Sequence, residues 1–353
     1  MKRIALYIFL MVSCSKGFSQ NVFNRIVEDT AAHIMNSVIT LDTGYVFLSG
    51  TRNIYNIRSF SLTFVNELGD KQWKKIYGDT QNEIWEGWNG NLRQHNEGCF
   101  VAGPYVNTNE NKRGIHISVF DSLLNLKSQS VICYDTIDKR AFNTIKTTFN
   151  DYFITGQICD SGDNDTYKLL LLKANHLGEY IWHKYYNINV SEYGSTIIET
   201  FNNNLVIGGR TEVSDVGNTR WYLIETDTAG NIIWERTFGR SNYNNGHVRG
   251  IIETADSNYL ACGSYPVARY GGGGGEYLWD GCLRKIDTDG NLIWEKRYRF
   301  YSKISNPEMI QIESSLNSII EKDGTLFLLG NHRDHRGASR GYLQKITDDG
   351  SIC

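Results

Sequence analysis

The chain has 353 residues, of which 41% are hydrophobic and 21% are charged, a composition that supports a packed core and excludes a wholly disordered protein. Eight Trp, 21 Tyr and 15 Phe accompany 34 Gly, whereas there are only 3 Pro and 4 Met, which is typical of strands joined by turns. The formal net charge of −3 argues against a nucleic-acid-binding role that depends on a strongly basic surface.

The first 20 residues are typical of an export signal. Lys2 and Arg3 precede an apolar run over residues 4–12, and small and polar residues follow; this order is that of a secretory signal peptide. The apolar run is too short to span a bilayer, which needs about 20 apolar residues. The sequence therefore predicts a signal peptide over residues 1–20 and no transmembrane span.

Two ways of processing this signal are open. Cleavage after Ser19 or Gln20 would release a soluble protein of residues 21–353, with a net charge of −6 because three basic residues and no acid are removed. Alternatively, the segment MVSC at residues 11–14 resembles an imperfect lipobox and would place a lipid on Cys14. We favour release, since Met11 stands where a lipobox usually has Leu; the protein is expected to be secreted or held at the cell envelope.

Six similar units follow the signal. Each unit contains a short apolar run that ends in Gly, and five of the six runs have a small residue before the Gly. These six glycines, called the repeat glycines below, are spaced by 53, 53, 53, 54 and 67 residues: Gly50, Gly103, Gly156, Gly209, Gly263 and Gly330. A nearly fixed period of this length indicates a repeat architecture.

The first unit shows how each copy is expected to fold. Apolar or alternating runs at 36–41, 45–50, 59–66 and 71–77 are separated by turn residues, which predicts four strands. Four short strands per unit are typical of a β-propeller blade. The fold class expected is therefore all-β: a six-bladed β-propeller with four-stranded antiparallel blades. An open solenoid is the alternative, but we find no polar capping units.

The two ends of the chain predict how the ring closes. The last unit stops at Cys353 before a fourth strand, and the octet FNRIVEDT at 23–30 aligns with WKKIYGDT at 73–80, the fourth strand of the first unit. We therefore expect the N-terminal segment to complete the last blade as one propeller domain over 21–353, which would remove exposed sheet edges. A further domain missing after Cys353 is the alternative.

A second motif, Asp-x-x-Gly-Asn-x-x-Trp, occurs in step with the repeat glycines. It is complete at Asp227, Gly230, Asn231 and Trp234 and again at Asp287, Gly290, Asn291 and Trp294, and it is degenerate at 120–129. We interpret it as structural: Gly and Asn accept positive φ in a tight turn, Asp bonds backbone amides, and Trp covers the adjacent blade.

These hairpins and repeat glycines resemble secreted bacterial β-propeller repeat proteins of the kind found in Bacteroidota. The resemblance covers nearly all of residues 21–353 and implies the propeller fold. It implies little about function, because proteins of this type are mostly uncharacterised.

Candidate metal sites are weak. Asp160, Asp163 and Asp165 offer oxygens to calcium, but the twelve-residue loop that supplies a full ligand set is missing. His332 and His335 lack the further ligands that zinc requires. We therefore predict no cofactor, with calcium at the three aspartates as the alternative.

Six cysteines follow the signal. Export permits disulfides, and Cys262 and Cys282 are expected on neighbouring strands of one blade, where a cross-strand bond is an open alternative. The other four are expected to behave as small buried apolar residues: Cys99, Cys133, Cys159 and Cys353.

Loop length differs between the two faces of the expected propeller. Turns between strands one and two and between strands three and four are short, whereas the links from strand two to strand three and between blades are longer and differ in every copy. Variable loops on one rim of a rigid scaffold indicate a binding surface. These loops contain the aromatic and basic residues that we take as binding candidates: Trp85, Trp88, Arg113, Arg220, Trp221, Tyr243, His247, Arg249, Tyr270, Trp279, Arg333 and Arg336.

The sequence thus favours an exported propeller that binds a protein or a glycan through its long-loop face, as a binding module or scaffold. A glycan hydrolase or lyase, with acidic residues from several blades meeting over the central channel, is the alternative. No nucleophile elbow, zinc-binding helix or phosphate-binding loop is present in the sequence.

Overall fold

The computed structural model describes the chain from residue 35 to residue 353, except for residues 88–89, 96–97, 136, 160–165, 188, 190, 213–218, 240–245, 270–276, 304–308, 313 and 334–338. Every regular element in the described residues is a β-strand. Within this part of the chain, no helix has the length and apolar character needed to cross a bilayer. The predicted signal peptide and the predicted closing strand at 23–30 lie outside the described residues.

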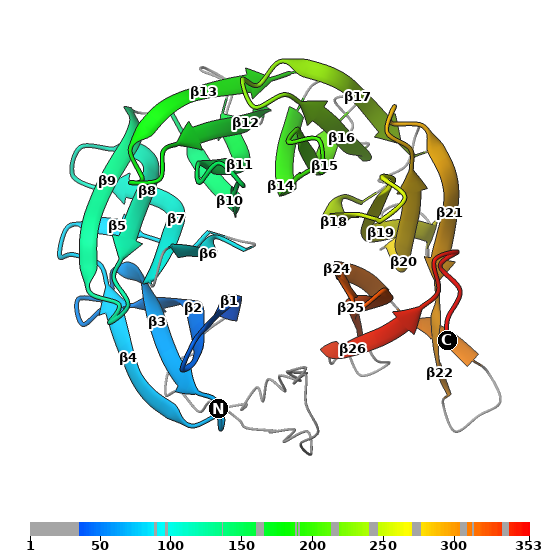
Figure 1. Ribbon diagram of the computed structural model, residues 1–353, viewed down its shortest axis with the longest axis horizontal. Coiled ribbons are helices and arrows are strands. Elements are labelled where there is room, and N and C mark those ends of the chain that lie inside the picture. Colours follow the sequence, from blue (N-terminus) through cyan, green and yellow to red (C-terminus); the bar gives the residue numbers. More distant parts are fainter. Residues whose placement is uncertain are drawn as a thin grey trace. The chain divides into compact units, whose positions relative to one another are not determined.

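The chain divides into two compact units, the first of which comprises residues 1–141 and 177–179. This unit contains two antiparallel sheets whose strands follow one another in chain order (Figure 1). The strands of the first blade are β1 (Met35–Leu41), β2 (Gly44–Arg52), β3 (Arg58–Asn66) and β4 (Lys71–Tyr77). Those of the second blade are β5 (Asn82–Ile84), β6 (Leu92–His95), β7 (Gly98–Asn107), β8 (Lys112–Phe120) and β9 (Leu126–Asp135).

The second unit comprises residues 142–176 and 180–353 and holds most of blade three and all of the last three blades. Blade three has β10 (Lys139–Lys146), β11 (Tyr152–Cys159), β12 (Tyr167–Ala174) and β13 (Tyr180–Tyr186). Blade four has β14 (Ser191–Glu199), β15 (Leu205–Glu212), β16 (Thr219–Thr226) and β17 (Ile232–Phe238). Blade five has β18 (Val248–Glu253), β19 (Tyr259–Arg269), β20 (Tyr277–Ile286) and β21 (Leu292–Tyr298). Blade six has β24 (Ser314–Lys322), β25 (Thr325–Arg333) and β26 (Ser339–Ile346).

This order of small antiparallel sheets confirms the predicted fold class, a six-bladed β-propeller. The four strands predicted for the first unit agree with β1–β4 to within two residues at each end. The sequence did not predict that the first strand of blade two is divided into β5 and β6, which both pair with β7. The longer last spacing, 67 residues instead of 53 or 54, arises from an inserted hairpin of β22 (Phe300–Lys303) and β23 (Met309–Ile312).

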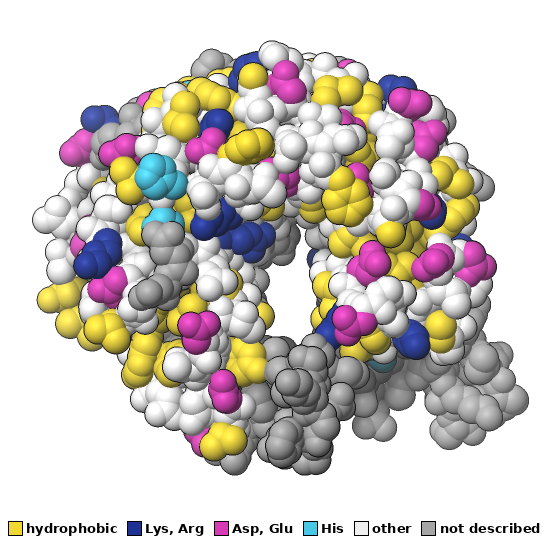
Figure 2. Space-filling model, in the orientation of Figure 1, with side chains coloured by type: hydrophobic (Ala, Val, Ile, Leu, Met, Phe, Trp, Pro, Cys, Tyr) yellow, Lys and Arg dark blue, Asp and Glu magenta, His cyan; other side chains and the backbone are white. Residues whose placement is uncertain are grey.

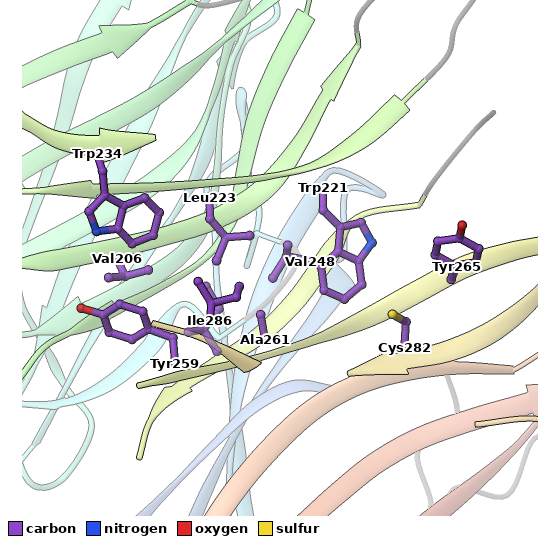
Figure 3. Close-up of a cluster of buried hydrophobic side chains, with 11 residues drawn as sticks. Val206, Trp221, Leu223, Trp234, Val248, Tyr259, Ala261, Tyr265, Cys282 and Ile286 are labelled. Carbon is purple, nitrogen blue, oxygen red and sulfur yellow. The ribbon is translucent and has the colours of Figure 1, made fainter. Parts of the chain in front are cut away.

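The core consists of several clusters, each formed where one blade packs on the next. In Figure 3, Val206 and Leu223 of blade four face Val248, Ala261 and Ile286 of blade five. All five side chains are buried. A fully buried Val, Leu or Ile side chain contributes about 1.5–3 kcal/mol relative to an exposed one, so these contacts hold neighbouring blades together.

The two cysteines of blade five do not form a disulfide. Cys262 pairs with Leu283 and Cys282 pairs with Gly263, so the two cysteines are one residue out of register. Because successive side chains of a strand point to opposite faces, the two sulfurs lie on opposite sides of the sheet. Both thiols are buried and free, which resolves the alternative left open by the sequence.

The Asp-x-x-Gly-Asn-x-x-Trp motif forms the turn that links the third and fourth strands of a blade. The Asp227 side chain accepts hydrogen bonds from the backbone N–H of Ala229 (2.9 Å) and Asn231 (2.8 Å), and Gly230 has a φ of +77°. The predicted roles of Asp and Gly are confirmed. Asn231 does not have the predicted positive φ; instead, its side-chain amide donates to Asp227 at 2.8 Å.

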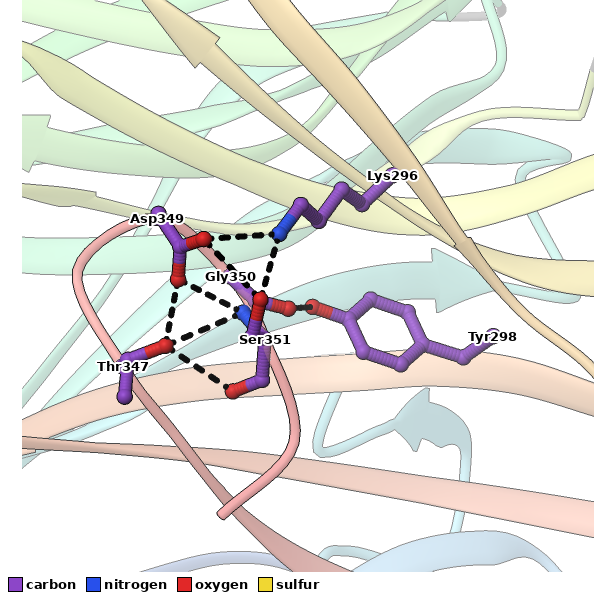
Figure 4. Close-up of polar contacts among 6 residues, drawn as sticks. All are labelled: Lys296, Tyr298, Thr347, Asp349, Gly350 and Ser351. Carbon is purple, nitrogen blue, oxygen red and sulfur yellow. Dashed lines mark hydrogen bonds and ion pairs between the residues drawn. The ribbon is translucent and has the colours of Figure 1, made fainter.

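The turn of one blade is held by the fourth strand of the preceding blade, in an arrangement called the turn clamp below. Figure 4 shows it for blades five and six: the Tyr298 hydroxyl donates to the Gly350 carbonyl at 2.7 Å, and Lys296 Nζ lies 3.2 Å from Asp349 Oδ2. A Cβ on Gly350 would lie 2.9 Å from the ring of Trp294. Trp, Lys and Tyr at alternate positions of a strand point to one face, so all three reach the same turn.

The same clamp recurs in the second unit. Tyr186 donates to the Gly230 carbonyl at 2.9 Å, and Trp234 Nε1 donates to the Thr288 carbonyl at 2.9 Å. The motif Trp therefore covers the turn of the next blade, as predicted. On the face shown in Figure 2, Lys and Arg side chains are interspersed with acidic ones and do not form an extended basic surface.

Candidate functional site

The repeat glycines determine where the candidate site lies. The innermost strand of blades four and five contains a β-bulge, at Gly194–Thr196 and at Val248–Gly250. The carbonyl oxygens of Tyr193 and His247, which precede these bulges, occupy the space that a Cβ would need on the repeat glycines Gly209 and Gly263. Only glycine permits this close backbone approach, and it fixes Tyr193 and His247 at equivalent positions of neighbouring blades.

Aromatic and basic side chains meet at these positions. The ring centroids of Tyr193 and His247 are 6.1 Å apart. The Arg210 guanidinium carbon lies 5.0 Å from the Tyr193 ring centroid, because Tyr193 and Arg210 are cross-strand partners in β14 and β15. Arg210 also forms an ion pair with Glu212 at 2.9 Å. We call Tyr193, Arg210, His247 and Arg249 the Arg–Tyr cluster.

Arg249 brings a second guanidinium to this cluster. It lies two residues after His247 in the bulge of β18, and its Nη1 donates to the Asn317 side-chain oxygen at 3.3 Å. Its Nε is buried and has no hydrogen-bond partner among the described residues. A buried N–H without a partner costs about 1–3 kcal/mol, so Arg249 retains hydrogen-bonding capacity that a bound acceptor would satisfy.

The ionisation of the cluster follows from its burial and its two cations. Burial, and then the charges of Arg249 and Arg210, lower the pKa of His247 to about 3, so the imidazole is neutral at physiological pH. Burial raises the pKa of Tyr193, although the two arginines oppose that shift. The cluster therefore presents two cations, a neutral imidazole and a phenol to the same region.

The nearby carboxylates are already engaged. Glu212 binds Arg210. The fully buried Glu192 accepts hydrogen bonds from the Thr211 hydroxyl (3.0 Å) and from the backbone N–H of Asn189 (2.6 Å). Glu192 is therefore bound by neutral donors, and Glu212 balances one of the two arginine charges.

Trp85 forms a separate aromatic site in the first unit. The Arg58 guanidinium carbon lies 4.3 Å from its ring centroid, which is a cation–π contact. Its Nε1 is buried and without a hydrogen-bond partner among the described residues. The protein itself thus partly covers the ring, and the indole N–H donates no hydrogen bond to the described residues.

Trp221 does not lie on a loop as predicted. It is fully buried in β16, where its Nε1 donates to the Ser264 carbonyl at 2.9 Å and the Arg284 guanidinium carbon lies 4.2 Å from its ring centroid. Figure 3 shows it inside the cluster between blades four and five. The predicted loop location was wrong because β16 begins at Thr219, which places Trp221 on the buried face of the strand.

Other candidates also lie in strands. Arg220 neighbours Trp221 in β16, and Trp279 lies half-buried in β20 opposite Pro266. Arg113 lies in β8 and pairs with Asp138 at 2.9 Å, and Arg333 ends β25. The remaining candidates lie outside the described residues: Trp88, Tyr243, Tyr270, Arg336 and the weak metal candidates Asp160, Asp163 and Asp165. Among the residues that are described, no group of three or more His, Cys, Asp or Glu could hold a metal ion.

The structure thus brings together two predicted residues, His247 and Arg249, and adds two that the sequence analysis missed, Tyr193 and Arg210. A signal for Tyr193 was present. Tyr193 and His247 each stand 16 residues before their repeat glycine, so aligning the copies on these glycines would have placed the two side chains together.

The chain is similar to known proteins only among solved structures, and only at low identity. No family model and no curated protein matches the chain. Among solved structures, the β-propeller domain of the Trilobed protease from Pyrococcus furiosus is similar with a TM-score of 0.47 and 10% identity, over 91% of this chain and 82% of that one. An exo-1,5-alpha-L-arabinanase from a bovine ruminal metagenomic library has a TM-score of 0.39 and 12% identity, over 92% and 98%.

Trypanosoma rangeli sialidase is also similar, with a TM-score of 0.49 and 11% identity. The similarity covers 98% of this chain and 60% of the sialidase chain. At these identities and TM-scores, the similarities say nothing about the function of this protein.

Proposed function

We propose that this protein is an exported binding module that recognises an acidic group of a protein or glycan through its long-loop face. The observation that carries this proposal is the Arg–Tyr cluster. Guanidinium groups bind carboxylate, sulfate and phosphate through charge-assisted hydrogen bonds, and Arg and Tyr are favoured at protein interfaces. The unpaired Nε of Arg249 adds a donor that such an acceptor would engage.

The ionisation of the cluster favours binding over catalysis. A general acid or base works best when its pKa lies near the working pH. Here the pKa of His247 is lowered to about 3 and that of Tyr193 is raised, so neither group exchanges a proton readily at neutral pH. A glycan hydrolase or lyase remains the alternative, and its test is the release of new reducing ends or unsaturated products from polygalacturonate or chondroitin sulfate.

The binding proposal is tested with acidic polymers of two chemistries, polygalacturonate and polyglutamate, and with neutral dextran as the reference. The variants are Arg249→Met and Arg210→Met, compared with Lys71→Met, which removes the same charge from an exposed position of β4. We expect each arginine variant to weaken binding of an acidic polymer at least tenfold in titration calorimetry, and the lysine variant to change it less than twofold. Equal effects of all three variants would refute the site.

Export is part of the proposal and is supported by the basic, apolar and polar order of residues 1–20. Mass spectrometry of the protein from its native host tests it. A mature N-terminus after Ser19 or Gln20 supports release, an acylated N-terminus at Cys14 supports an anchored form at the cell envelope, and an intact Met1 refutes export.

A further inference from the structure

Among the described fourth strands, only that of blade two lacks all three clamp side chains; blade four keeps the Trp and has Arg236 and Phe238 at the other two positions. In blade two the position of the motif Trp is taken by Ser128, and the positions of the clamp Lys and Tyr are taken by Ser130 and Ile132. The turn that this strand faces is 177–179, which belongs to the first unit. The bond that Tyr makes elsewhere is replaced by a longer one, 3.4 Å from Ser130 Oγ to the Gly178 carbonyl.

Because blade two lacks the clamp Trp, the turn glycine Gly178 packs against different side chains than the turn glycines of other blades do. In the regular copies, a Cβ on Gly290 or Gly350 would meet the ring of a clamp Trp. A Cβ on Gly178 would instead meet Ile117 and Val119 of β8, at 2.9 and 3.1 Å. The turn therefore packs directly on the third strand, and no indole from the fourth strand lies beside it.

A pocket of about 660 Å³ lies at this place. Val119 and Leu177 contribute apolar wall, the backbone of Gly178 lies beside them, and Lys127 and Glu179 contribute charge. Ser128, at the position of the missing indole, is exposed and lines the same pocket. All lining residues belong to the first unit. The pocket thus occupies the space beside the turn that an indole fills in other copies.

We propose that this pocket binds the side chain of a tryptophan residue from a partner protein. The repeat itself identifies the occupant, since the equivalent turn glycines at 290 and 350 each pack on an indole ring. Tryptophan is also among the residues that most often anchor protein interfaces in pockets. This interaction surface is separate from the Arg–Tyr cluster, which lies in the second unit, so either proposal can fail without the other.

N-acetyltryptophanamide serves as the probe, and its binding to the chain of residues 21–353 is observed by saturation-transfer difference NMR. A single side chain in a surface pocket is expected to bind with a Kd on the order of 1 mM. We expect saturation of the indole protons and at least tenfold weaker saturation of N-acetylleucinamide. Equal saturation of both probes, or of neither, would refute the proposal.

Ser128→Trp restores the internal indole and tests the location. We expect it to reduce probe binding at least tenfold and to raise the midpoint of guanidinium unfolding. Thr237→Trp is the matched control, because it adds a Trp at an exposed position of the fourth strand of blade four, and it should leave probe binding unchanged. If Ser128→Trp fails to fold, Ser128→Met fills the same space with a flexible side chain and must also reduce binding; unchanged binding in the folded variant overturns the proposal.

Discussion

The turn clamp makes a quantitative prediction at Gly290. This residue has a φ of +81°, and a Cβ on it would lie 2.7 Å from Cε3 of Trp234 and 3.0 Å from Cγ of Arg236. Gly324, in the turn between β24 and β25, offers a matched control. Its φ is +69°, and a Cβ there would meet nothing within 4 Å. Both glycines have a left-handed backbone conformation, but only Gly290 is covered by the side chains of a turn clamp.

Alanine at Gly324 is therefore expected to cost only the left-handed backbone strain, about 1–2 kcal/mol of unfolding free energy. Alanine at Gly290 should lower the unfolding free energy by the same backbone strain and, because its Cβ displaces the Trp234 indole, by about 1–3 kcal/mol more, the cost typical of an overpacked core. Equilibrium unfolding in guanidinium, followed by tryptophan fluorescence, measures both values.

A double-mutant cycle attributes the difference to the clamp. In a Trp234→Leu background the indole is absent, so Gly290→Ala should cost no more than Gly324→Ala does. Residues in contact show coupling of about 0.5–3 kcal/mol. If Gly290→Ala and Gly324→Ala are equally destabilising in the wild-type background, or if the extra cost at Gly290 persists without Trp234, the indole does not restrain this turn.

Three further predictions concern buried groups. Burial lowers the pKa of His247 to about 3, whereas a His in an unfolded chain titrates near 6.5, so between these pH values the unfolded chain binds a proton that the folded chain does not. The free energy of unfolding should therefore fall by on the order of 1 kcal/mol per pH unit as the pH drops from about 6.5 toward 3. In the His247→Gln variant, the loss of unfolding free energy between pH 7 and pH 4.5 should be smaller than in the wild type. Glu295 forms ion pairs with the buried Arg284 at 2.7 Å and with Arg297 at 2.8 Å, so Glu295→Gln should lower the free energy of unfolding in guanidinium by about 3 kcal/mol. An unfolding free energy equal to that of the wild type within error would contradict this. Burial raises the pKa of Cys262 and of Cys282 to about 12, so both thiols should resist Ellman's reagent until the protein unfolds and should then react. A reducing agent should leave the melting temperature unchanged. A Cys262–Cys282 disulfide in the purified chain would show that the register of β19 and β20 is wrong.

Much of the fold was predictable because the copies repeat backbone requirements. The repeat glycines keep room for the carbonyl oxygens of Tyr193 and His247, and the turn aspartates bond their own backbone. These needs are local and recur in several blades; the carbonyl oxygens of Trp85 and Ser315, for example, take the equivalent space at Gly103 and Gly330. They therefore appear at a nearly fixed spacing that a single sequence reveals. The only sign of the hairpin of β22 and β23 that we find in the sequence is the longer interval before the last repeat glycine.

The candidate site was less predictable because loop assignment depends on where a strand begins. Trp221 was predicted to lie on a long loop, but β16 begins two residues earlier, at Thr219, so Trp221 lies in the strand with its ring buried against Arg284. Arg210 was not chosen as a candidate, because the sequence alone does not show that its cross-strand partner is Tyr193.

Function in this scaffold is therefore best sought where one copy departs from the others. Positions 193 and 247 are structurally equivalent and carry Tyr and His, and the position two residues later carries Ser195 in blade four and Arg249 in blade five. The bulge fixes the backbone at these positions, whereas the side chains make different contacts: Ser195 is buried and donates to the Gly208 carbonyl at 3.1 Å, and Arg249 donates to Asn317. Ser128 is a second such departure: it stands where other blades have the clamp Trp, and a pocket lies beside it. The regular copies hold the blades together, and we propose that the irregular ones provide the surface that a partner recognises.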